Sequence, residues 1–533
     1  MRVLAPARGK EGTVPIPAAT APAFNRRMTA ATISARPEAR ARPGPATAAG
    51  ETGERAAAGW PVAILGIPFD HVALADAVGR IDAMIATRRP HYVVTANVDF
   101  LVQASRDVEL RRILLEADLV LCDGTPLVWA SRCLGNRLPG RAAGADIVPR
   151  LIAAAAANGR RVFFLGAAPG VAAAAAARLR SQYPALQVAG HYAPPFAGLL
   201  EMDHEEIVRR VRAARPDVLL VSFGCPKQEK WIAMHHRGLG VPVVIGVGAT
   251  IDFLAGRVRR APVWMRQSGT EWIFRLLQEP RRLFRRYADD LLRFLPALAK
   301  QAWRLHRRTD PAGLSVPPGA CHTYRWLRVE AGRLLTAEAL RRHAARWQEL
   351  RAETRDCLLD LSRVEAIDST GVALLGRWRQ QLNARARRFV VLSPSAAVRD
   401  ALDRLRLTDH FVIARSVAEA AQQMETFPDG SMIVQPGGSI RSVAWAGEIT
   451  AANTGEVWDR TVQHLLELGG TREAFPIDLS RLRFIDSTGA ALMLRLQRWA
   501  EQMELEIHFV GAQANVRNVL ELSGLDETLL EAA

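Results

Sequence analysis

The 533-residue sequence predicts an α/β protein of several domains: a parallel-sheet domain with a basic helical appendage, followed by two small α/β modules. Three observations lead to this prediction. Short apolar runs alternate with helical patterns in the centre of the chain, a basic amphipathic stretch follows, and the phrase IDSTG occurs twice near the C-terminus. The length also exceeds that of one ordinary domain.

Residues 1–59 are rich in Ala, Pro and Arg and show no apolar periodicity, which predicts disorder. They lack the continuous apolar core of a signal peptide, and Met28 is an alternative start. The whole chain is 49% hydrophobic and 23% charged, so it can bury substantial cores, yet it has no uninterrupted apolar run of about 18 residues. Five cysteines without CxxC spacing favour neither a disulfide framework nor a zinc site, and a reducing cytoplasm fits them.

Residues 60–256, the central domain, contain the apolar runs. These runs are Tyr92 to Thr95, Leu119 to Cys122, Val162 to Leu165, Val218 to Ser222 and Val243 to Val247. Continuous Val, Ile and Leu strands separated by helices favour a Rossmann-like parallel sheet that is covered on both faces. Ligands of such sheets bind beyond the carboxyl ends of the strands.

Polar residues and glycines gather at these strand ends. They are Thr95, Asn97, Asp123, Gly124, Gly166, Gly170, Gly224, Lys227, Gln228, Gly246 and Asp252. Three of the loops are glycine-bearing turns that enter helices, where backbone N–H groups and the helix dipole can receive a diphosphate. The GAAPG turn lacks both GK(S/T) and GxGxxG spacing, which argues against ATPase and dehydrogenase functions. A tight strand-to-helix turn explains any one glycine, but together they favour a nucleotide-type ligand.

Residues 257–309, the appendage, hold most of the basicity of a chain whose net charge is +16. Between Arg257 and Arg308, fourteen Arg and Lys stand against four Asp and Glu. Apolar residues at spacings of three and four predict amphipathic helices, broken by Pro280 and Pro296. Such basic helices bind anionic membranes. The alternative is that they pack on their own domain with solvated charges, and nucleic acid is not favoured because no reading motif accompanies the charge.

Residues 310–320 form a Pro/Gly-rich linker to the first module (residues 321–427) and the second module (428–533). In each module an apolar strand pattern ends at Asp-Ser-Thr-Gly and gives way to a helical pattern. Ser369 and Ser487 are therefore expected where a helix begins, with their hydroxyls near solvent. A phosphate there would meet backbone N–H donors and alter any partner surface over the turn. The alternative is that both serines are helix caps.

The central domain and appendage resemble the WecG/TagA/CpsF family of bacterial glycosyltransferases from about residue 62 to 290. The motifs that carry the resemblance are TANVDFLVQASRDVELRRILLEADLVLCDGTPLVWASRCLG, GADIVPRL, FFLGAAPG, LLVSFGCPKQEKWI, GVGATIDFLAG and RRAPVWMRQSGTEWIFRLLQEPRRL. The family implies a UDP-sugar donor, often UDP-N-acetylmannosamine or UDP-glucose, and a polyprenyl-diphosphate-linked acceptor. It places the enzyme peripherally on the cytoplasmic face of the plasma membrane, in cell-surface polysaccharide synthesis.

The same resemblance implies an inverting displacement, with Asp123 as the base that accepts a proton from the acceptor hydroxyl. The alternative for Asp123 is an ordinary turn aspartate before Gly124. Thr95 and Asn97 match the family's TxN and are expected to bind donor sugar or acceptor, and Gln228 to orient the substrate or the departing diphosphate. His191 and His204 are left without a role.

No DxD-like acidic pair occupies a motif position, so we expect no metal and no cofactor. The cation that meets the diphosphate is expected from the appendage, as in the family. Arg275 is the best positional match, with Arg281 and Arg282 as alternates.

Both modules resemble STAS domains, the fold of bacterial anti-sigma-factor antagonists. That resemblance implies reversible phosphorylation of Ser369 and Ser487 by a serine kinase and control of an anti-sigma-like partner. Two hypotheses follow for the whole chain: an active transferase with regulatory modules, or a signalling scaffold whose transferase fold only binds ligands. The presence of Thr95, Asn97, Asp123 and Gln228 favours the enzyme. The sequence leaves open whether copies of the chain associate with one another.

Overall fold

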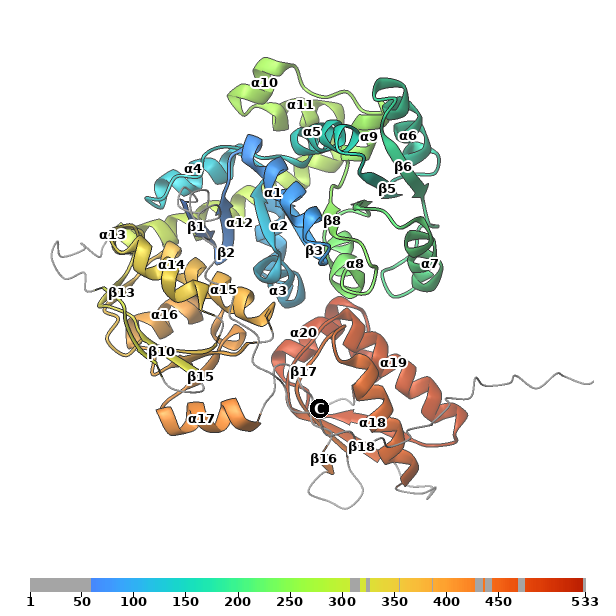
Figure 1. Cartoon of the computed structure of the whole chain (residues 1–533). Helices are drawn as coiled ribbons and strands as arrows, with labels where there is room; N and C mark the ends of the chain where they lie inside the picture. Colours follow the sequence, from blue (N-terminus) through green and yellow to red (C-terminus); the bar gives the residue numbers. More distant parts are fainter. Residues whose placement is uncertain are drawn as a thin grey trace, which may run out of the picture. The chain divides into compact units, whose positions relative to one another are not determined.

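The computed structural model describes residues 59–306, 317–322, 326–353, 355–385, 387–426, 435–436, 443–467 and 475–530 (Figure 1). The disorder predicted for residues 1–59 falls outside these ranges except at Gly59. Most of the predicted linker, residues 310–316, also falls outside them.

The central domain is built on a six-stranded parallel sheet, as the apolar runs predict. Its strand order is β4-β3-β8-β7-β5-β6. The strands are β3 (His91–Ala96), β4 (Leu119–Cys122), β5 (Arg161–Gly166), β6 (Gln187–Tyr192), β7 (Val218–Ser222) and β8 (Val243–Gly246). The helices are α1 (Leu74–Ala86), α2 (Val98–Ala104), α3 (Val108–Glu116), α4 (Thr125–Cys133), α5 (Gly144–Ala157), α6 (Val171–Gln182), α7 (His204–Ala214), α8 (Lys227–His235) and α9 (Thr250–Ala255). The predicted Rossmann-like sheet is confirmed.

Two hydrophobic cores cover this sheet, one on each face. Successive strand residues point to opposite faces, so Val93 and Leu121 belong to one core whereas Val94 and Val120 belong to the other. The first of these cores also contains α1, α5, α6 and α9; the second contains α2, α3, α4, α7 and α8. Burial on both sides explains why the strands are almost purely apolar.

A hairpin of β1 (Gly59–Ile64) and β2 (Ile67–His71) precedes the sheet, and the appendage returns to it. The appendage comprises α10 (Val263–Ser268), α11 (Glu271–Gln278) and α12 (Pro280–His306). Gln301 on α12 accepts a 3.0 Å hydrogen bond from the backbone N–H of Leu65 and donates one of 2.9 Å to the carbonyl of Ala63. These bonds anchor α12 to the hairpin.

Helix α12 begins at Pro280, as predicted, but it runs through Pro296, so the predicted break there is wrong. Proline removes a single helical N–H donor. Phe294, only 2% exposed, packs into the core of the central domain, and Leu298 and Ala302 pack against that core, so the helix is held on both sides of the proline. Tertiary packing therefore outweighs the local preference.

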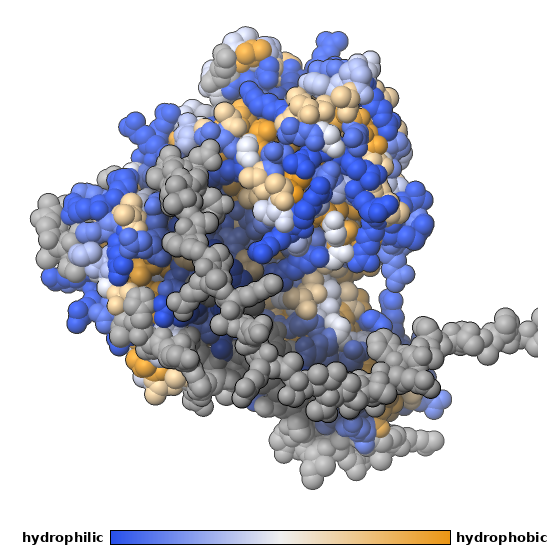
Figure 2. All heavy atoms as spheres, viewed as in Figure 1, coloured by the Kyte–Doolittle hydropathy of each residue, from blue (hydrophilic) through white to orange (hydrophobic). Residues whose placement is uncertain are grey.

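Large apolar side chains are exposed on all three helices of the appendage. They are Val263, Trp264, Trp272, Leu277, Phe284, Leu291, Leu292, Leu295 and Trp303. On the face seen in Figure 2, patches of apolar residues lie among hydrophilic ones. In the part of the chain described above, no helix is both long enough and apolar enough to cross a bilayer.

The first module has a five-stranded sheet in the order β15-β14-β12-β10-β9. Its elements are β9 (Gly319–His322), β10 (Trp326–Glu330), β11 (Leu334–Leu335), α13 (Ala337–Arg342), α14 (Ala344–Ala352), β12 (Asp356–Asp360), β13 (Ala366–Ile367), α15 (Ser369–Asn383), β14 (Phe389–Leu392), α16 (Ala396–Arg404), the 3-10 turn Thr408–His410, β15 (Val412–Ala414) and α17 (Val417–Thr426).

The second module repeats the plan with a four-stranded sheet in the order β16-β17-β18-β19. Its elements are β16 (Gln435–Pro436), β17 (Val443–Ile449), α18 (Thr454–Glu467), β18 (Phe475–Ile485), α19 (Ser487–Gln502), β19 (Ile507–Val510), α20 (Ala514–Leu522) and α21 (Asp526–Leu529). Each module has its own hydrophobic core. The small α/β modules predicted from the duplicated phrase are confirmed.

The two serine turns correct the sequence analysis. Helices α15 and α19 begin at Ser369 and Ser487, but the residues that cap them are Asp368 and Asp486, whose carboxylates accept backbone hydrogen bonds from the next turn. The serines are 3% and 1% exposed, so the predicted placement of their hydroxyls near solvent is wrong. The cause is tertiary: Ser487 is covered by Glu109 of α3, and the residue after Ser369, Thr370, bonds Asn136 of the central domain.

Candidate functional site

Asp123 lies at the carboxyl edge of the sheet, immediately after β4. Its backbone N–H donates a 2.8 Å hydrogen bond to the carbonyl of Ala96, the last residue of β3. The loops after the two neighbouring strands therefore meet, and a Cβ built on Gly124 would lie 3.9 Å from that of Asn97. Asn97 caps α2 by accepting a hydrogen bond from the N–H of Phe100. The structure thus places Asp123, Gly124 and Asn97 together.

The environment of Asp123 suits a general base. Burial raises the pKa of its carboxyl group to about 6, Arg141 and Arg275 oppose this rise, and Glu271 and Asp146 add to it. A carboxyl group with this pKa is mostly ionised at neutral pH, yet basic enough to take a proton during a reaction. The arginines also make the surroundings attractive to an anionic ligand.

Arg141 organises the charges around Asp123. It donates hydrogen bonds of 2.6 Å to Glu271 and 2.8 Å to Asp146. Arg260 binds the other oxygen of Asp146 at 2.9 Å. The sequence analysis missed Arg141, Asp146, Arg260 and Glu271, although Asp146 stands in the GADIVPRL motif and Glu271 in EWIFR.

Of the three appendage arginines singled out from the sequence, Arg275 lies near the site. Its guanidinium is 5.3 Å from the ring centroid of Phe253 on α9, and its charge acts on the carboxyl group of Asp123. Arg281 is exposed on the first turn of α12. Arg282 belongs to the same turn, and its side chain lies outside the described residues.

The side chains of Thr95 and Gln228 form hydrogen bonds within the protein. Thr95 is buried and donates to the carbonyl of Gly246 at 3.3 Å. The Gln228 side-chain oxygen accepts 3.2 Å hydrogen bonds from the N–H groups of both Gly224 and Gly248, and its NH₂ donates to Glu229 at 2.7 Å. Gln228 therefore fixes the loops after β7 and β8 relative to each other. Its predicted role in orienting substrate stays a prediction.

Two of the predicted glycines are required by close packing. Gly166 has φ +95°, and a Cβ there would lie 2.4 Å from the carbonyl oxygen of Ser222. A Cβ on Gly246 would lie 2.9 Å from Nε2 of Gln228 and from Oε1 of Glu229. Gly166 lets the end of β7 approach closely, and Gly246 leaves room for two side chains of α8, so packing explains both glycines without any ligand.

Lys227 and Asp252 lie at the N-terminal ends of helices on this edge. Lys227 donates to the carbonyl of Ala197, and burial lowers its pKa. Burial raises the pKa of Asp252. Neither side chain is shown bonded to Asp123, and their roles in binding substrate stay predictions.

Glu229 is a further feature that sequence reasoning missed. It is 2% exposed, burial raises the pKa of its carboxyl group to about 7, and its Oε2 atom has no hydrogen-bond partner among the described residues. His204, left without a role, bonds His235 at 2.8 Å and the carbonyl of Leu199, so it serves local structure. Among the residues that the structure describes, no three His, Cys, Asp or Glu side chains form a group that could hold a metal ion.

Comparison with known proteins agrees with this arrangement. Residues 62–308 match the family model "Glycosyl transferase WecG/TagA/CpsF family", residues 334–420 match a STAS domain, and residues 438–531 match the family "Mlab, STAS domain". Two relatives from Staphylococcus aureus, of strains MW2 and NCTC 8325 / PS 47, are each 31% identical over 242 residues. The match covers 45% of this chain and 93% of each relative. Both relatives are named N-acetylglucosaminyldiphosphoundecaprenol N-acetyl-beta-D-mannosaminyltransferase.

Proposed function

The chain is a glycosyltransferase of the WecG/TagA/CpsF family, and from this premise we propose that it moves a sugar from a UDP-sugar to a polyprenyl-diphosphate-linked acceptor in the synthesis of a cell-surface polysaccharide. The observation that carries the proposal is the position of Asp123, at the end of β4, with a pKa of about 6 and two arginines acting on it. A base and cations at one edge of the sheet are what sugar transfer from a nucleotide diphosphate requires.

The proposed reaction is a single displacement with inversion. The acceptor hydroxyl attacks the anomeric carbon of the donor, the bond from that carbon to the UDP oxygen breaks, and Asp123 accepts the hydroxyl proton. General-base assistance of this kind contributes about two to four orders of magnitude in rate. Asn97, directly after the neighbouring strand β3, is the group we assign to sugar or acceptor binding. Thr95 is buried and bonded to the carbonyl of Gly246, so we assign it the support of this strand end, and its predicted contact with substrate stays a prediction.

The departing UDP carries the negative charge that must be stabilised. Arg275 supplies the cation in this proposal, with Arg141 and Arg260 holding the carboxylates that position the appendage. A guanidinium binds phosphate oxygens in a planar, bidentate manner. We therefore propose that transfer needs no metal ion.

The donor is proposed to be UDP-N-acetylmannosamine or a UDP-glucose-like sugar. The names of the Staphylococcus aureus relatives favour the former, and favour an acceptor that ends in N-acetylglucosamine on undecaprenyl diphosphate. Because such an acceptor resides in the membrane, we place the enzyme peripherally on the cytoplasmic face. The exposed apolar side chains of the appendage, together with its many arginines, support this placement.

The modules are proposed to regulate the enzyme or bind partners, with Ser369 and Ser487 as phosphorylation sites for a serine kinase. The competing proposal, that the chain is a scaffold with a non-catalytic domain, is disfavoured because Asp123 keeps the environment of a base.

The experiment is to incubate the purified full chain with a panel of UDP-sugars and lipid-linked N-acetylglucosamine, with and without EDTA. We expect a lipid-linked disaccharide from one donor and the same rate in EDTA. If product forms without EDTA but not with it, metal independence is refuted and the transferase function stands. If no donor gives product under either condition, the scaffold is favoured.

A further inference from the structure

The second module touches the central domain through one of its duplicated serines. The backbone N–H of Ser487 donates a 2.5 Å hydrogen bond to one carboxylate oxygen of Glu109, and the Ser487 hydroxyl donates a 2.7 Å bond to the other. Glu109 lies in the first turn of α3, and both residues are 1% exposed. A buried carboxylate is thus clamped by two donors from the same residue.

Glu109 also contacts Lys230 on α8. Lys230 lies 2.9 Å from Oε2 of Glu109 and 2.9 Å from Asp107. Although burial disfavours its charged form, these two carboxylates raise the pKa of Lys230, so the ammonium group stays protonated. Lys230 follows Gln228 by two residues on α8, and Gln228 holds the two glycine loops at the carboxyl edge of the sheet. Contacts therefore run from Ser487 through Glu109 to α8, the helix that also carries Gln228.

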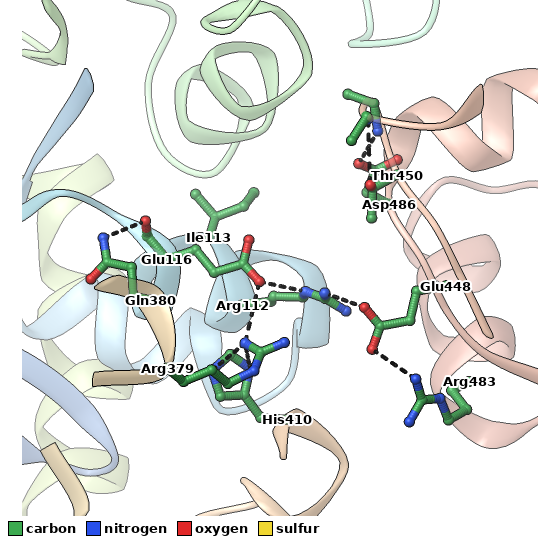
Figure 3. A network of polar contacts seen from close by, with 12 residues as sticks. Arg112, Ile113, Glu116, Arg379, Gln380, His410, Glu448, Thr450, Arg483 and Asp486 are labelled. Carbon is green, nitrogen blue, oxygen red and sulfur yellow. Dashed lines mark hydrogen bonds and ion pairs between the residues drawn. The ribbon is translucent and has the colours of Figure 1, made fainter. Parts of the chain in front are cut away.

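Further contacts seat the second module on α3. Asn518 on α20 accepts a 3.3 Å hydrogen bond from the N–H of Val108, whose side chain packs on the core of the module. Arg112, one turn along α3, pairs with Glu448 (Figure 3). Its guanidinium also lies 4.3 Å from the ring centroid of Phe484. Burial disfavours the charged form of the Glu448 carboxyl group, but the positive charge of Arg112 outweighs this effect and lowers the pKa of Glu448 to about 2.

The first module docks differently. Its hydroxyl at Ser369 has no hydrogen-bond partner among the described residues. The contacts come instead from Thr370, which accepts a 3.0 Å hydrogen bond from Asn136, and from Arg377, which pairs with Asp70 at 2.6 Å. The residue of the second module that corresponds to Arg377 is Arg495, and it stacks on Trp458 within its own module at 4.0 Å.

Negative charge is already crowded around Ser487. Asp486 precedes it, and burial together with Glu109 raises the pKa of the Asp486 carboxyl group to about 7. Lys230, the cation that pairs with Glu109, is shared with Asp107. Arg112, whose charge acts on Asp486, is already paired with Glu116 and Glu448. An additional anion at residue 487 would face Glu109 at hydrogen-bond distance, and this repulsion opposes the docked arrangement.

We propose that the second module is an intramolecular partner of the central domain, seated on α3 through Ser487 and Glu109, and that a negative charge at residue 487 releases it and loosens α8. The catalytic consequence, a change in the loops that Gln228 holds, rests on the proposed function; the docking does not. The partner that covers the first turn of α3 is the IDSTG turn of the second module in the same chain.

Amide hydrogen exchange on the full chain tests the docking without any substrate. Ser487→Asp is expected to raise exchange in the first turns of α3 and α19, and in α8, by at least about tenfold, while β18 stays protected. Ser369→Ala is the matched control from the first module, and it should exchange like wild type because its hydroxyl bonds nothing described. Unchanged exchange in α3 and α19 of Ser487→Asp, with β18 protected, overturns the docking; unchanged α8 alone overturns the coupling to the site.

The double variant Ser487→Asp with Glu109→Gln makes the test specific. It again places one carboxylate near Lys230, so protection of α3 and α19 should return towards wild type; no recovery overturns the charge mechanism. If Ser487→Asp unfolds the module and exposes β18, Glu109→Gln provides the test instead, because it alters no residue of the module. That variant should speed exchange in the first turn of α19, and wild-type exchange there overturns the proposal. A chain that docks but transfers no sugar would refute only the proposed function.

Discussion

Arg141 of the central domain donates a 2.6 Å hydrogen bond to Glu271, the first residue of α11. The contact joins the loop before α5 to the appendage, and both residues act on the pKa of Asp123. The appendage therefore takes part in building the charge environment of the proposed base. The proposed role of the appendage in catalysis rests on this relationship and is separate from its proposed role at the membrane.

Arg275→Ala should lower the rate of transfer by about 100-fold or more, because it removes the cation proposed to meet the departing diphosphate. The matched control is Arg281→Ala, six residues along and exposed, which should keep nearly wild-type turnover. Steady-state kinetics on both variants make the comparison. Equal losses of activity in the two variants would remove Arg275 from this role and would attribute the effect to the overall positive charge of the appendage.

Turnover should rise with pH through about pH 6 and level off above it, because Asp123 must be ionised to accept a proton and its pKa is about 6. The profile of kcat/KM against pH provides the measurement. A rate that is flat from pH 5 to 8 would argue against a carboxylate base with this pKa.

Asp123→Asn should raise the stability of the protein at pH 7. The raised pKa means that the folded state binds the Asp123 proton more tightly than the unfolded state, so this group's contribution to stability falls as pH rises from about 4 to about 6. Removing the charge should gain on the order of 1 kcal/mol, since one pKa unit corresponds to about 1.4 kcal/mol and the side chain keeps some solvent contact. Thermal melts at pH 7 and pH 4 should show the gain only at pH 7; a lower Tm at pH 7 contradicts it.

Phe284→Glu with Leu292→Glu should weaken binding to anionic vesicles by at least about tenfold, because two apolar groups on the exposed side of α12 become charged. Leu522→Glu is the control, an exposed leucine of the second module that should leave binding unchanged. Vesicle co-sedimentation at physiological salt gives the result. If the double variant and the control bind equally well, α12 is not the membrane surface.

Much of the fold follows from local sequence patterns. The runs Leu119–Cys122 and Val218–Ser222 coincide with β4 and β7, because strands buried on both faces must be almost entirely apolar. The break at Pro280 was also predictable, since proline is well suited to the first turn of a helix. Pro296 was not, because its helix is held by packing that joins residues far apart in the chain.

The candidate site was likewise predictable only in part. A strand-end rule and a family resemblance pointed to Asp123, and the structure places Asn97 beside it. Arg141 was missed because its importance comes from Glu271, 130 residues later. The burial of Ser487 was missed for a similar reason: its partner, Glu109, is 378 residues away, and no local pattern announces such a contact.

The central claim, that Asp123 is the base of a sugar transfer, is tested most directly by comparing wild type with Asp123→Asn in the same preparation, with UDP-N-acetylmannosamine as donor and lipid-linked N-acetylglucosamine as acceptor. Product formation and donor binding are measured side by side. The account predicts that Asp123→Asn forms product about 100-fold more slowly or worse, while it binds the UDP-sugar as wild type does. Near-wild-type turnover of Asp123→Asn would contradict it.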